Sequence, residues 1–174
     1  MIVSGPFVPD DQQLAALLDL TARVRLSDGI EAQIALHVFE PGPQQATMHA
    51  VFAEGRMVGA IVALRYHEPE AMLVVDPEWR RQGIGRMLVA ALQQEMSDTH
   101  EPEGLLIADL GSASARPFID ALGVPLVEAE YQMEITGSPS SPRPVIDGLV
   151  FRNATSDDRE VLIQVHMAAF SADA

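Results

Sequence analysis

The stretch Ala71-Met72-Leu73-Val74-Val75-Asp76-Pro77-Glu78-Trp79-Arg80-Arg81-Gln82-Gly83-Ile84-Gly85-Arg86 decides the fold of this chain. Its five leading apolar residues predict a buried strand, Pro77 predicts a turn, and the apolar residues after Gly83 recur at helical spacing. A strand, a glycine-containing turn and a helix in this order leave backbone N–H groups unpaired at the start of the helix. Because arginines flank these groups, the stretch predicts a binding site for a diphosphate.

The composition excludes several classes of protein. The 174 residues carry a net charge of -14, all 11 basic residues are arginine, and cysteine is absent. Without lysine there can be no Walker P-loop and no Schiff base, and without cysteine there is no disulfide or Cys-ligated zinc. The acidic balance disfavours nucleic acid and suits a neutral or cationic small substrate. No membrane-length apolar run and no secretion signal is found, so we expect a cytoplasmic protein that does not bind membranes.

Local patterns predict the elements before the quoted stretch. Asp10 is the expected N-cap of a helix from about Asp11 to Leu26. Two strands at 47–53 and 57–66 form a hairpin that turns at Glu54-Gly55-Arg56. For residues 30–45 the sequence pattern is compatible with a short helix and with a strand, and both alternatives stay open. The second strand of the hairpin is apolar on both faces and is expected at the centre of the sheet, with Val58, Ala60, Val62 and Leu64 on one side and Met57, Ile61 and Ala63 on the other.

The elements after the quoted stretch follow from the same rules. A buried strand is expected at 105–110, and a helix that opens within 111–115 should stop at Gly123, a C-terminal signal. Residues 124–135 are expected to close the sheet. The helix of the quoted stretch should face the core with the apolar residues Ile84, Leu88, Ala91, Leu92 and Met96.

The chain is expected to divide into a domain at 1–137, a Pro/Ser-rich linker at 138–147, and the strand-helix start of a second, truncated domain at 148–174. The segment 10–14 is similar to 157–161, because each has two acids, two polar residues and then the first apolar residue of a helix. The alternative, that two ordinary helix starts look alike, stays open. The second helix has an apolar stripe that we expect to pack on its own domain, on a neighbouring one, or in a homodimer.

A dinucleotide-binding fingerprint is an alternative for this stretch, because it also places glycines after a strand. It requires a Gly directly after the strand and a third Gly where this chain has Leu88. The chain instead has Val75-Asp76-Pro77 followed by Arg80-Arg81-Gln82-Gly83-Ile84-Gly85. These residues resemble the signature of the GCN5-related N-acetyltransferase (GNAT) superfamily, a strand ending in Val-x-Pro and then Arg/Gln-x-x-Gly-x-Gly/Ala. The alternative of a plain Gly-rich strand-to-helix turn is the weaker one in this context.

The resemblance implies the α/β (α+β) GNAT fold, with a central mixed, mostly antiparallel twisted sheet of about six or seven strands, about four flanking helices, and a splay between strands 4 and 5. It implies acetyl-CoA (coenzyme A) as the cofactor. The splayed strand would pair with the pantetheine arm, and the following backbone N–H groups would hold the pyrophosphate. The implied cofactor-binding residues are Leu73, Val74, Val75, Arg80, Arg81, Gln82, Gly83, Ile84, Gly85 and Arg86, and a solvated surface arginine is the alternative for each arginine.

For catalysis, the resemblance implies that the backbone N–H near Val75 stabilises the thioester oxyanion. Glu70 is the candidate general base, acting through water, although an exposed strand-end carboxylate is the alternative. The tyrosine that family members often carry as the acid falls at Ile119, beside Phe118, so a hydroxyl is missing. No metal is expected, because none of the five histidines shows ligand spacing: His37, His49, His67, His100 and His166.

The implied function is an acetyltransferase that transfers acetyl to a primary amine of a small molecule, whose identity would depend on residues near 28–45 and 124–135. The chain also resembles the N-terminal half of tandem members of the superfamily. In such proteins one domain can bind cofactor while the other does the chemistry. The alternative is therefore a non-catalytic acetyl-CoA-binding or scaffolding domain.

Overall fold

In the computed structural model the described residues are 2–30, 34, 39, 45–65, 69–101, 103–109, 111–129, 148, 150 and 152–170. The chain divides into two compact units, Met1–Val127 and Glu128–Ala174. The first unit contains the five strands and the site, and the second contains the helix α4 (Arg159–Phe170).

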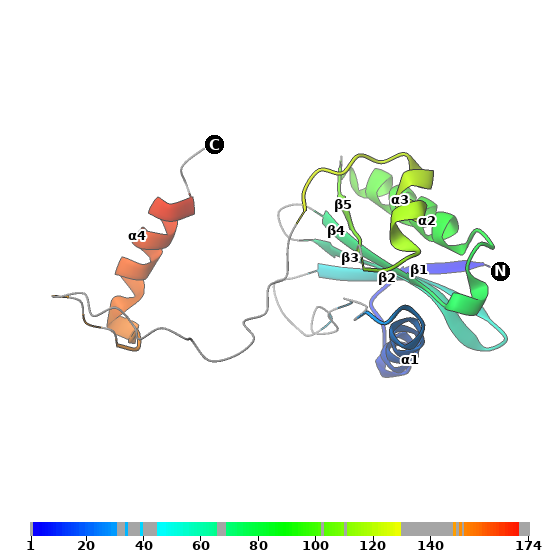
Figure 1. Ribbon diagram of the computed structural model, residues 1–174, viewed down its shortest axis with the longest axis horizontal. Coiled ribbons are helices and arrows are strands. Elements are labelled where there is room, and N and C mark those ends of the chain that lie inside the picture. The colour runs from blue at the N-terminus through cyan, green and yellow to red at the C-terminus, as the bar shows by residue number, and fades with distance from the viewer. Residues whose placement is uncertain are drawn as a thin grey trace. The chain divides into compact units, whose positions relative to one another are not determined.

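The five strands form one sheet in chain order, as Figure 1 shows. Their bounds are β1 (Val3–Phe7), β2 (Gln45–Ala53), β3 (Arg56–Arg65), β4 (Pro69–Val75) and β5 (Leu105–Ile107). The first three pairings are antiparallel and the β4–β5 pairing is parallel, which confirms a mixed, mostly antiparallel sheet. The predicted closing strand would lie at 124–135, but 124–129 is irregular and 130–135 lies outside the described residues.

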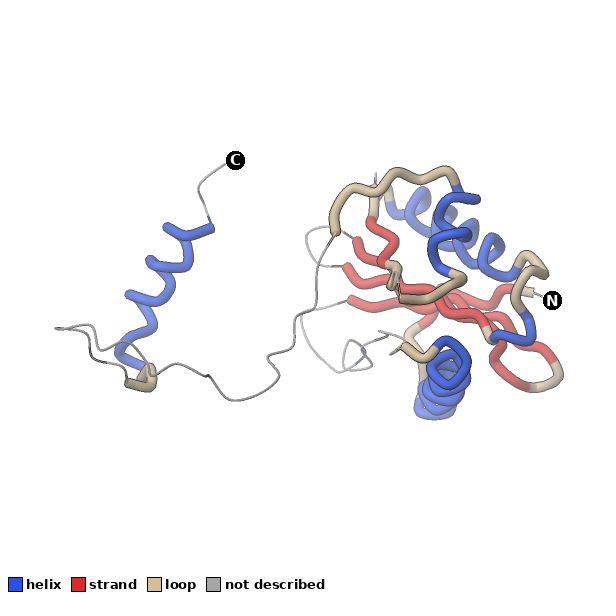
Figure 2. Tube along the Cα trace, in the orientation of Figure 1, coloured by secondary structure: helices blue, strands red, loops and turns tan. Residues whose placement is uncertain are grey.

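Helices cover both faces of the sheet (Figure 2). The helix α1 (Asp11–Asp28) lies on one face, whereas α2 (Ile84–Thr99) and α3 (Ala115–Leu122) lie on the other. Each face has its own apolar core, because β3 is buried on both sides. The buried apolar side chains of the helices are Leu17, Leu20 and Val24 from α1, and Ile84, Leu88 and Leu92 from α2.

The ends of α1 and the hairpin turn follow the predicted local signals. The Asp10 carboxylate accepts from Gln13 N at 2.8 Å while the Gln13 side chain accepts from Asp10 N at 2.9 Å, a complete capping box. The helix ends at Gly29, whose φ of 70° is left-handed. Between β2 and β3, Glu54 and Gly55 have φ of 54° and 74°, so both adopt the positive φ of a type I′ hairpin turn.

One predicted face assignment is wrong at the start of β3. Met57 packs in the core under α1 and Val58 in the core under α2, the reverse of the expected alternation. The reason is a β-bulge: Val51 pairs with Gly59 but Phe52 pairs with Met57, so Val58 is an extra residue. An extra residue shifts the alternation by one, and side chains before it change face.

A charged cluster lies under the C-terminal half of α2. The carboxylate of Glu95, whose side chain is 7% exposed, contacts His49 Nε2 at 2.6 Å. It also accepts from Arg65 Nη2 at 2.7 Å and from Thr47 Oγ1 at 2.9 Å. Burial alone would raise the pKa of Glu95, but hydrogen bonds from His49 and Thr47 and the charge of Arg65 outweigh it and lower the pKa. Glu95 was not among the residues expected on the inner face of α2.

In the second unit, the helical segment starts at Thr155. Its backbone N–H donates to Asp158 at 2.7 Å, which gives a capping box like that of Asp10. When the two N-caps are aligned, Asp10 corresponds to Thr155 and not to Asp157. The predicted alignment of 10–14 with 157–161 therefore shifts by two residues. The apolar side chains of α4 are exposed, with Leu162 and Val165 at 51% and 60%. The predicted strand and linker before this helix lie mostly outside the described residues.

Candidate functional site

The pairing of β4 with β5 stops before β4 ends. The ladder joins Glu70 to Leu105 and finishes where Met72 pairs with Ile107, although β4 continues to Val75. Within the described residues no strand pairs with Leu73–Val75 on this side. The predicted splay of the two strands is thereby confirmed, and β5 is only three residues long, not the six expected from 105–110.

The backbone of Val75 faces this opening. Asp76 N–H donates to the carbonyl of Val58 on β3 at 2.9 Å. Because N–H and C=O groups alternate between the two edges of a strand, Val75 must direct its own N–H and C=O away from β3. A second contact agrees with this, since Arg80 Nε donates to the Val75 carbonyl at 3.1 Å from the following loop.

The loop after β4 delivers the chain to the start of α2. Asp76 caps a short 3₁₀ turn, Pro77–Trp79, by accepting from Glu78 N at 3.0 Å. Arg81 and Gly83 then adopt left-handed φ of 63° and 85°, and Gly83 is the N-cap of α2. These turns connect the end of β4 to the N-terminus of α2, in the strand-turn-helix order that the motif predicts.

Several N–H groups at this N-terminus have no acceptor. The bond from Met87 N to Gly83 O, 3.0 Å long, is the first of the helix, and no side chain in the described part of the chain caps the end. Over the described residues, the N–H groups of Arg81–Arg86 find no hydrogen-bond partner. A Cβ built on Gly83 would meet nothing within 4 Å, so the space before it is open. Unpaired N–H groups and the helix dipole suit an anion here.

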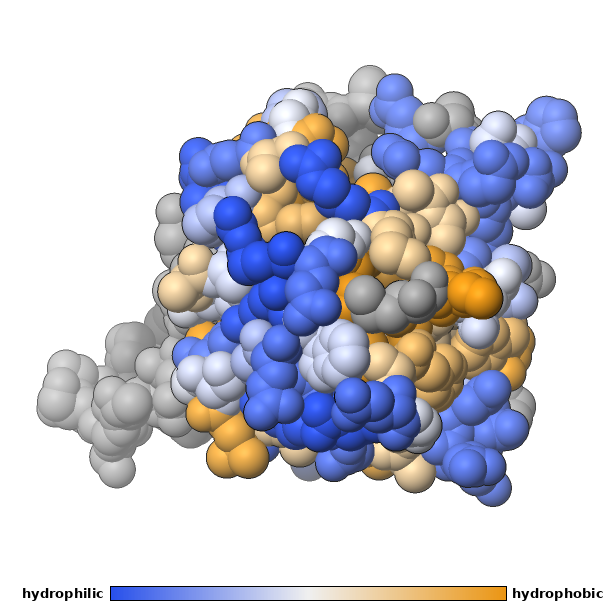
Figure 3. Space-filling view, turned by 90° about the vertical axis from the view of Figure 1, so that its right-hand side faces the viewer, coloured by the Kyte–Doolittle hydropathy of each residue, from blue (hydrophilic) through white to orange (hydrophobic). Residues whose placement is uncertain are grey.

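The three arginines of the motif differ in what they contact. Arg80 pairs through both terminal nitrogens with the Asp28 carboxylate, at 2.8 and 3.0 Å. Arg86 donates to the Ala121 carbonyl of α3 at 2.8 Å. Arg81 is exposed and has no partner within the described part of the chain. Figure 3 looks onto this side of the domain, where hydrophilic side chains gather beside an apolar area. Of the three, Arg80 is paired with an acid, Arg86 with a neutral carbonyl, and Arg81 with neither among the described residues.

Two glycines allow close packing beneath the site. A Cβ on Gly85 would lie 2.9 Å from the ring of Phe118, so Gly85 makes room for α3. A Cβ on Gly59 of β3 would lie 2.6 Å from Ile84 Cγ2 and 3.2 Å from Leu88 Cδ1. Gly59 therefore lets the first turn of α2 lie close to the sheet. The motif predicted a glycine at 85, but no local signal pointed to Gly59.

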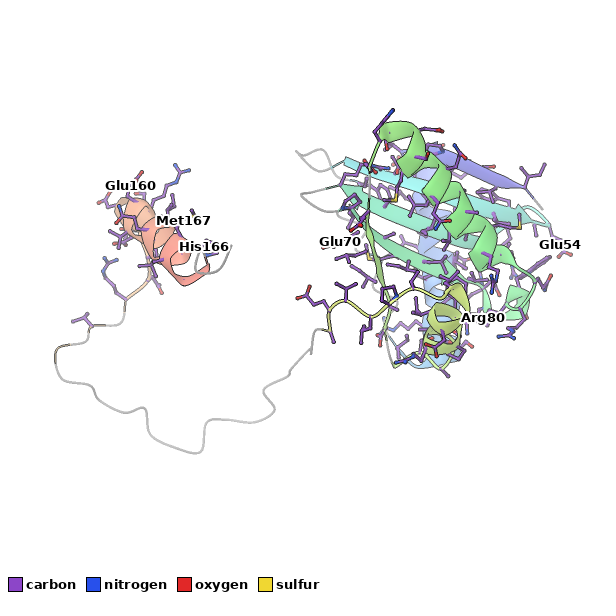
Figure 4. The ribbon with its side chains drawn as sticks, turned by 90° about the horizontal axis from the view of Figure 1, so that it is seen from above. Glu54, Glu70, Arg80, Glu160, His166 and Met167 are labelled. Atoms are coloured by element: carbon purple, nitrogen blue, oxygen red, sulfur yellow. The ribbon has the colours of Figure 1, made fainter. Side chains whose placement is uncertain are left out.

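The candidate base lies away from the open end of β4. Glu70 is the second residue of β4 and Val75 is the last, so the two are separated by about 17 Å at roughly 3.3 Å per residue. Figure 4 shows Glu70 and Arg80 far apart on the domain. Glu70 lines a small cavity of about 120 Å³ together with Arg65 and Glu101. The side chains of Ile119 and Phe118 on α3 supply no hydroxyl.

Long-range contacts that no local sequence pattern predicted connect the loop to the rest of the domain, through Arg23, Asp28 and Ser112. Asp76 is buried and pairs with Arg23 of α1 at 2.7 Å. Asp28, at the end of α1, accepts from Arg80 and also from Ser112 Oγ at 2.9 Å. Burial alone would raise the pKa of Asp28, but the hydrogen bonds from Arg80 and Ser112 and the charge of Arg80 lower it. These partners are 52 to 84 residues apart, so no local pattern reveals them.

The described residues contain neither a metal-binding cluster nor a membrane-spanning helix. No group of three or more His, Cys, Asp or Glu side chains among them is arranged to hold a metal ion. None of the helices they form combines the length and the apolarity that crossing a membrane demands.

Comparison with known proteins gives a consistent set of similarities. The family model described as "Acetyltransferase (GNAT) domain" matches residues 26–134, more than half of the chain. The mycothiol acetyltransferase of Clavibacter michiganensis subsp. michiganensis is 30% identical, over 94% of this chain and 55% of that protein. The mycothiol acetyltransferase of Mycolicibacterium vanbaalenii is 31% identical, over 88% of this chain and 51% of that protein. The chain thus spans about half the length of these curated relatives.

Solved structures agree on the fold. The ribosomal-protein-alanine N-acetyltransferase of Brucella melitensis biovar Abortus 2308 superposes with a TM-score of 0.58 at 12% identity, over 77% of this chain and 98% of that one. An aminoglycoside acetyltransferase from an uncultured soil metagenomic sample gives a TM-score of 0.54 at 19% identity, over 75% and 93% of the two chains. At these identities the likeness concerns the fold alone.

Proposed function

Because this chain belongs to the GNAT acetyltransferase family, we propose that its first unit binds acetyl-CoA at the open end of β4 and transfers the acetyl group to a primary amine of a small molecule. GNAT domains use acetyl-CoA. One observation carries the proposal: a strand end without a partner is followed directly by a helix N-terminus whose N–H groups are unpaired. The first suits an amide-containing arm and the second a diphosphate.

The residues fit the two halves of this cofactor. The edge formed by Leu73, Val74 and Val75 has the spacing of a strand and would pair with the amides of the pantetheine arm. The N–H groups from Arg81 through Gln82, Gly83, Ile84 and Gly85 to Arg86 would bind the pyrophosphate, with the Arg81 guanidinium as its countercharge. Arg80 would contribute through its backbone and through Val75, because its side chain is paired with Asp28.

The chemistry proposed is attack of a neutral amine on the thioester carbonyl. Acetyl-CoA supplies the acetyl group as a thioester. The N–H of Val75 would donate to the carbonyl oxygen as negative charge develops on it, and one well-placed donor contributes about 3 kcal/mol of transition-state stabilisation. Glu70 stays the candidate for taking the amine proton through water, with an exposed carboxylate at the start of β4 as the alternative.

A second candidate function is acetyl-CoA binding without catalysis. It is favoured by the positions of the acid and base candidates: Glu70 is at the far end of β4, and Ile119 and Phe118 carry no hydroxyl. In this case the domain would hold cofactor or serve as a scaffold while a second domain did the chemistry.

The second unit is proposed to be the beginning of such a domain. Three observations support this: the cap at Thr155 repeats the cap at Asp10, α4 exposes its apolar side chains, and the curated relatives are about twice as long as the region they share with this chain. Matched by their caps, the buried Leu17 and Leu20 of α1 correspond to the exposed Leu162 and Val165. The stripe would pack on a sheet of its own.

Calorimetric titration with acetyl-CoA tests cofactor binding. The variant Arg81→Glu reverses the charge of an exposed motif arginine and should weaken binding about tenfold, equivalent to about 1.4 kcal/mol, because it repels the diphosphate. The matched control is Arg116→Glu on α3, an exposed arginine paired with Asp120 one helical turn away, which should bind as the wild type does.

Release of free CoA in the presence of a panel of small primary amines then separates the two functions. Amine-dependent release would support acetyl transfer, and binding without release would support the cofactor-holding domain. If the wild-type chain failed to bind acetyl-CoA, both candidates would be wrong. Equal affinity of Arg81→Glu and the wild type would remove the assignment of the pyrophosphate site to this loop.

A further inference from the structure

Two ion pairs of opposite direction connect α1 to the loop between β4 and α2. Arg23 of α1 donates through Nε to the Asp76 carboxylate at 2.7 Å, and Asp76 is 1% exposed. In the second ion pair the acid is on the helix and the base is on the loop, because Asp28 of α1 accepts from Arg80. Asp28 is itself 8% exposed. The two loop residues Asp76 and Arg80 are therefore each held by an ion pair with α1.

The Asp28 carboxylate joins three segments at the point where β4 and β5 diverge. Arg80 binds it in the bidentate manner, with Nη1 to Oδ1 at 2.8 Å and Nη2 to Oδ2 at 3.0 Å. Ser112, which is buried in the segment between β5 and α3, donates to Oδ2 at 2.9 Å and lies 3.0 Å from the hydroxyl of Ser114. Bidentate pairing with a buried carboxylate fixes the plane of a guanidinium as well as its position.

Held in this plane, Arg80 turns its remaining nitrogen to the strand. Its Nε donates to the Val75 carbonyl at 3.1 Å, and this carbonyl faces the opening beside β4. Without the contact, the last residue of the strand would present both an acceptor and a donor to the opening. A free carbonyl oxygen beside a developing oxyanion is repulsive, whereas the guanidinium is attractive. When Arg80 is bound to this carbonyl, Val75 presents its N–H donor to the opening and no free acceptor.

We propose that Asp28 is a positioning residue for acetyl transfer: it holds Arg80 on the Val75 carbonyl, so that the open end of β4 donates to the thioester carbonyl and does not compete as an acceptor. The inference rests on the proposed function, since it concerns the same carbonyl. It differs from a purely structural role of Asp28 in one respect. Loss of Asp28 should change how the thioester carbonyl is polarised, whereas the hold of the N-terminus of α2 on the diphosphate should persist.

The test is an infrared difference spectrum of acetyl-CoA labelled with ¹³C at the thioester carbonyl, bound to the full chain. Donation from Val75 should move the carbonyl band of the wild-type complex to lower frequency. Asp28→Asn and Arg80→Gln should each lose most of this shift, and the double variant should lose no more than either, because the two residues act in series. Asp28→Glu should restore part of it. Asp120→Asn, an exposed acid on α3, should leave it unchanged.

Affinities complete the test. Asp28→Asn should bind acetyl-CoA several-fold more weakly but CoA, which has no thioester carbonyl, as tightly as the wild type does. If Asp28→Asn does not fold, Arg80→Gln carries the test, because glutamine keeps a hydrogen-bonding side chain without the guanidinium. If the carbonyl band of bound acetyl-CoA had the same frequency in the wild type and in Arg80→Gln, the role of Asp28 and Arg80 would be overturned and the proposed function would stand. Failure of the wild type to bind acetyl-CoA would overturn the proposed function as well.

Discussion

Replacing Glu95 by alanine should lower the free energy of unfolding of the first unit by about 3–5 kcal/mol, the range seen when one partner of a buried ion pair is removed. The carboxylate receives contacts from His49, Arg65 and Thr47 at 2.6–2.9 Å, and the variant leaves all three without this partner. The loss is large against the roughly 5–15 kcal/mol that stabilises a whole domain. Urea unfolding followed by circular dichroism at neutral pH measures it.

The control is Asp98→Asn, on the exposed side of the same helix, which should change stability by less than about 0.5 kcal/mol. The isosteric variant Glu95→Gln removes the charge but keeps the volume, and should cost about 1.5–3 kcal/mol, the worth of a hydrogen bond to a charged group. If Glu95→Ala cost less than about 1 kcal/mol, the cluster would not hold α2 on the sheet.

The contribution of Glu95 to the free energy of unfolding should decrease at low pH. The pKa of Glu95 is lower in the folded chain than its ordinary value. A carboxyl whose pKa is lowered by folding stabilises the fold fully above its unfolded pKa, about 4.3. This stabilisation disappears as the pH falls through the folded pKa. The stability difference between the wild type and Glu95→Gln should therefore be constant above about pH 6 and shrink below about pH 4. A difference that stayed constant down to the acid transition would contradict this argument.

The remaining predictions concern the backbone. Asp10→Ala removes the N-cap of α1 and should cost about 1 kcal/mol in the same assay, whereas Asp10→Asn should cost much less. Gly59→Ala places a Cβ 2.6 Å from Ile84 Cγ2 and should destabilise by about 1–3 kcal/mol and weaken acetyl-CoA binding, because the first turn of α2 must move; unchanged affinity would show that the turn tolerates displacement. Gly83→Ala meets no atom but must adopt φ of 85°, so a cost of about 1–2 kcal/mol without a packing defect is expected.

Short-range signals were enough for the elements around the site. The cap at Asp10, the turn at Glu54-Gly55, the stop at Gly123 and the strand-turn-helix of the motif depend on neighbouring residues, and all are confirmed. The fold followed from them, because a hairpin before the motif and a helix after it leave few arrangements. The identities of the cofactor and catalytic residues stay predictions.

Features that depend on distant residues could not be predicted. Glu95 has the sequence environment of a surface glutamate, and only the approach of His49 and Arg65 from other strands makes it a buried one. Asp28 resembled an ordinary residue near the end of a helix, and its pairing spans 52 residues. The bulge at Val58 reversed the face of Met57 and Val58, because a bulge depends on how β2 pairs with β3 and not on composition. In each case the missing information was which segments meet.

The unpaired end of β4 also affects how molecules of this protein behave toward one another at high concentration. A strand edge with free N–H and C=O groups can pair with the same edge of another molecule, the first step of edge-to-edge aggregation. Leu73–Val75 is apolar and offers no charge of its own, but Arg80 occupies the last carbonyl and places a cation beside it. A ligand lying along the strand would close the rest of the edge, so the concentration of that ligand would affect solubility as well as turnover.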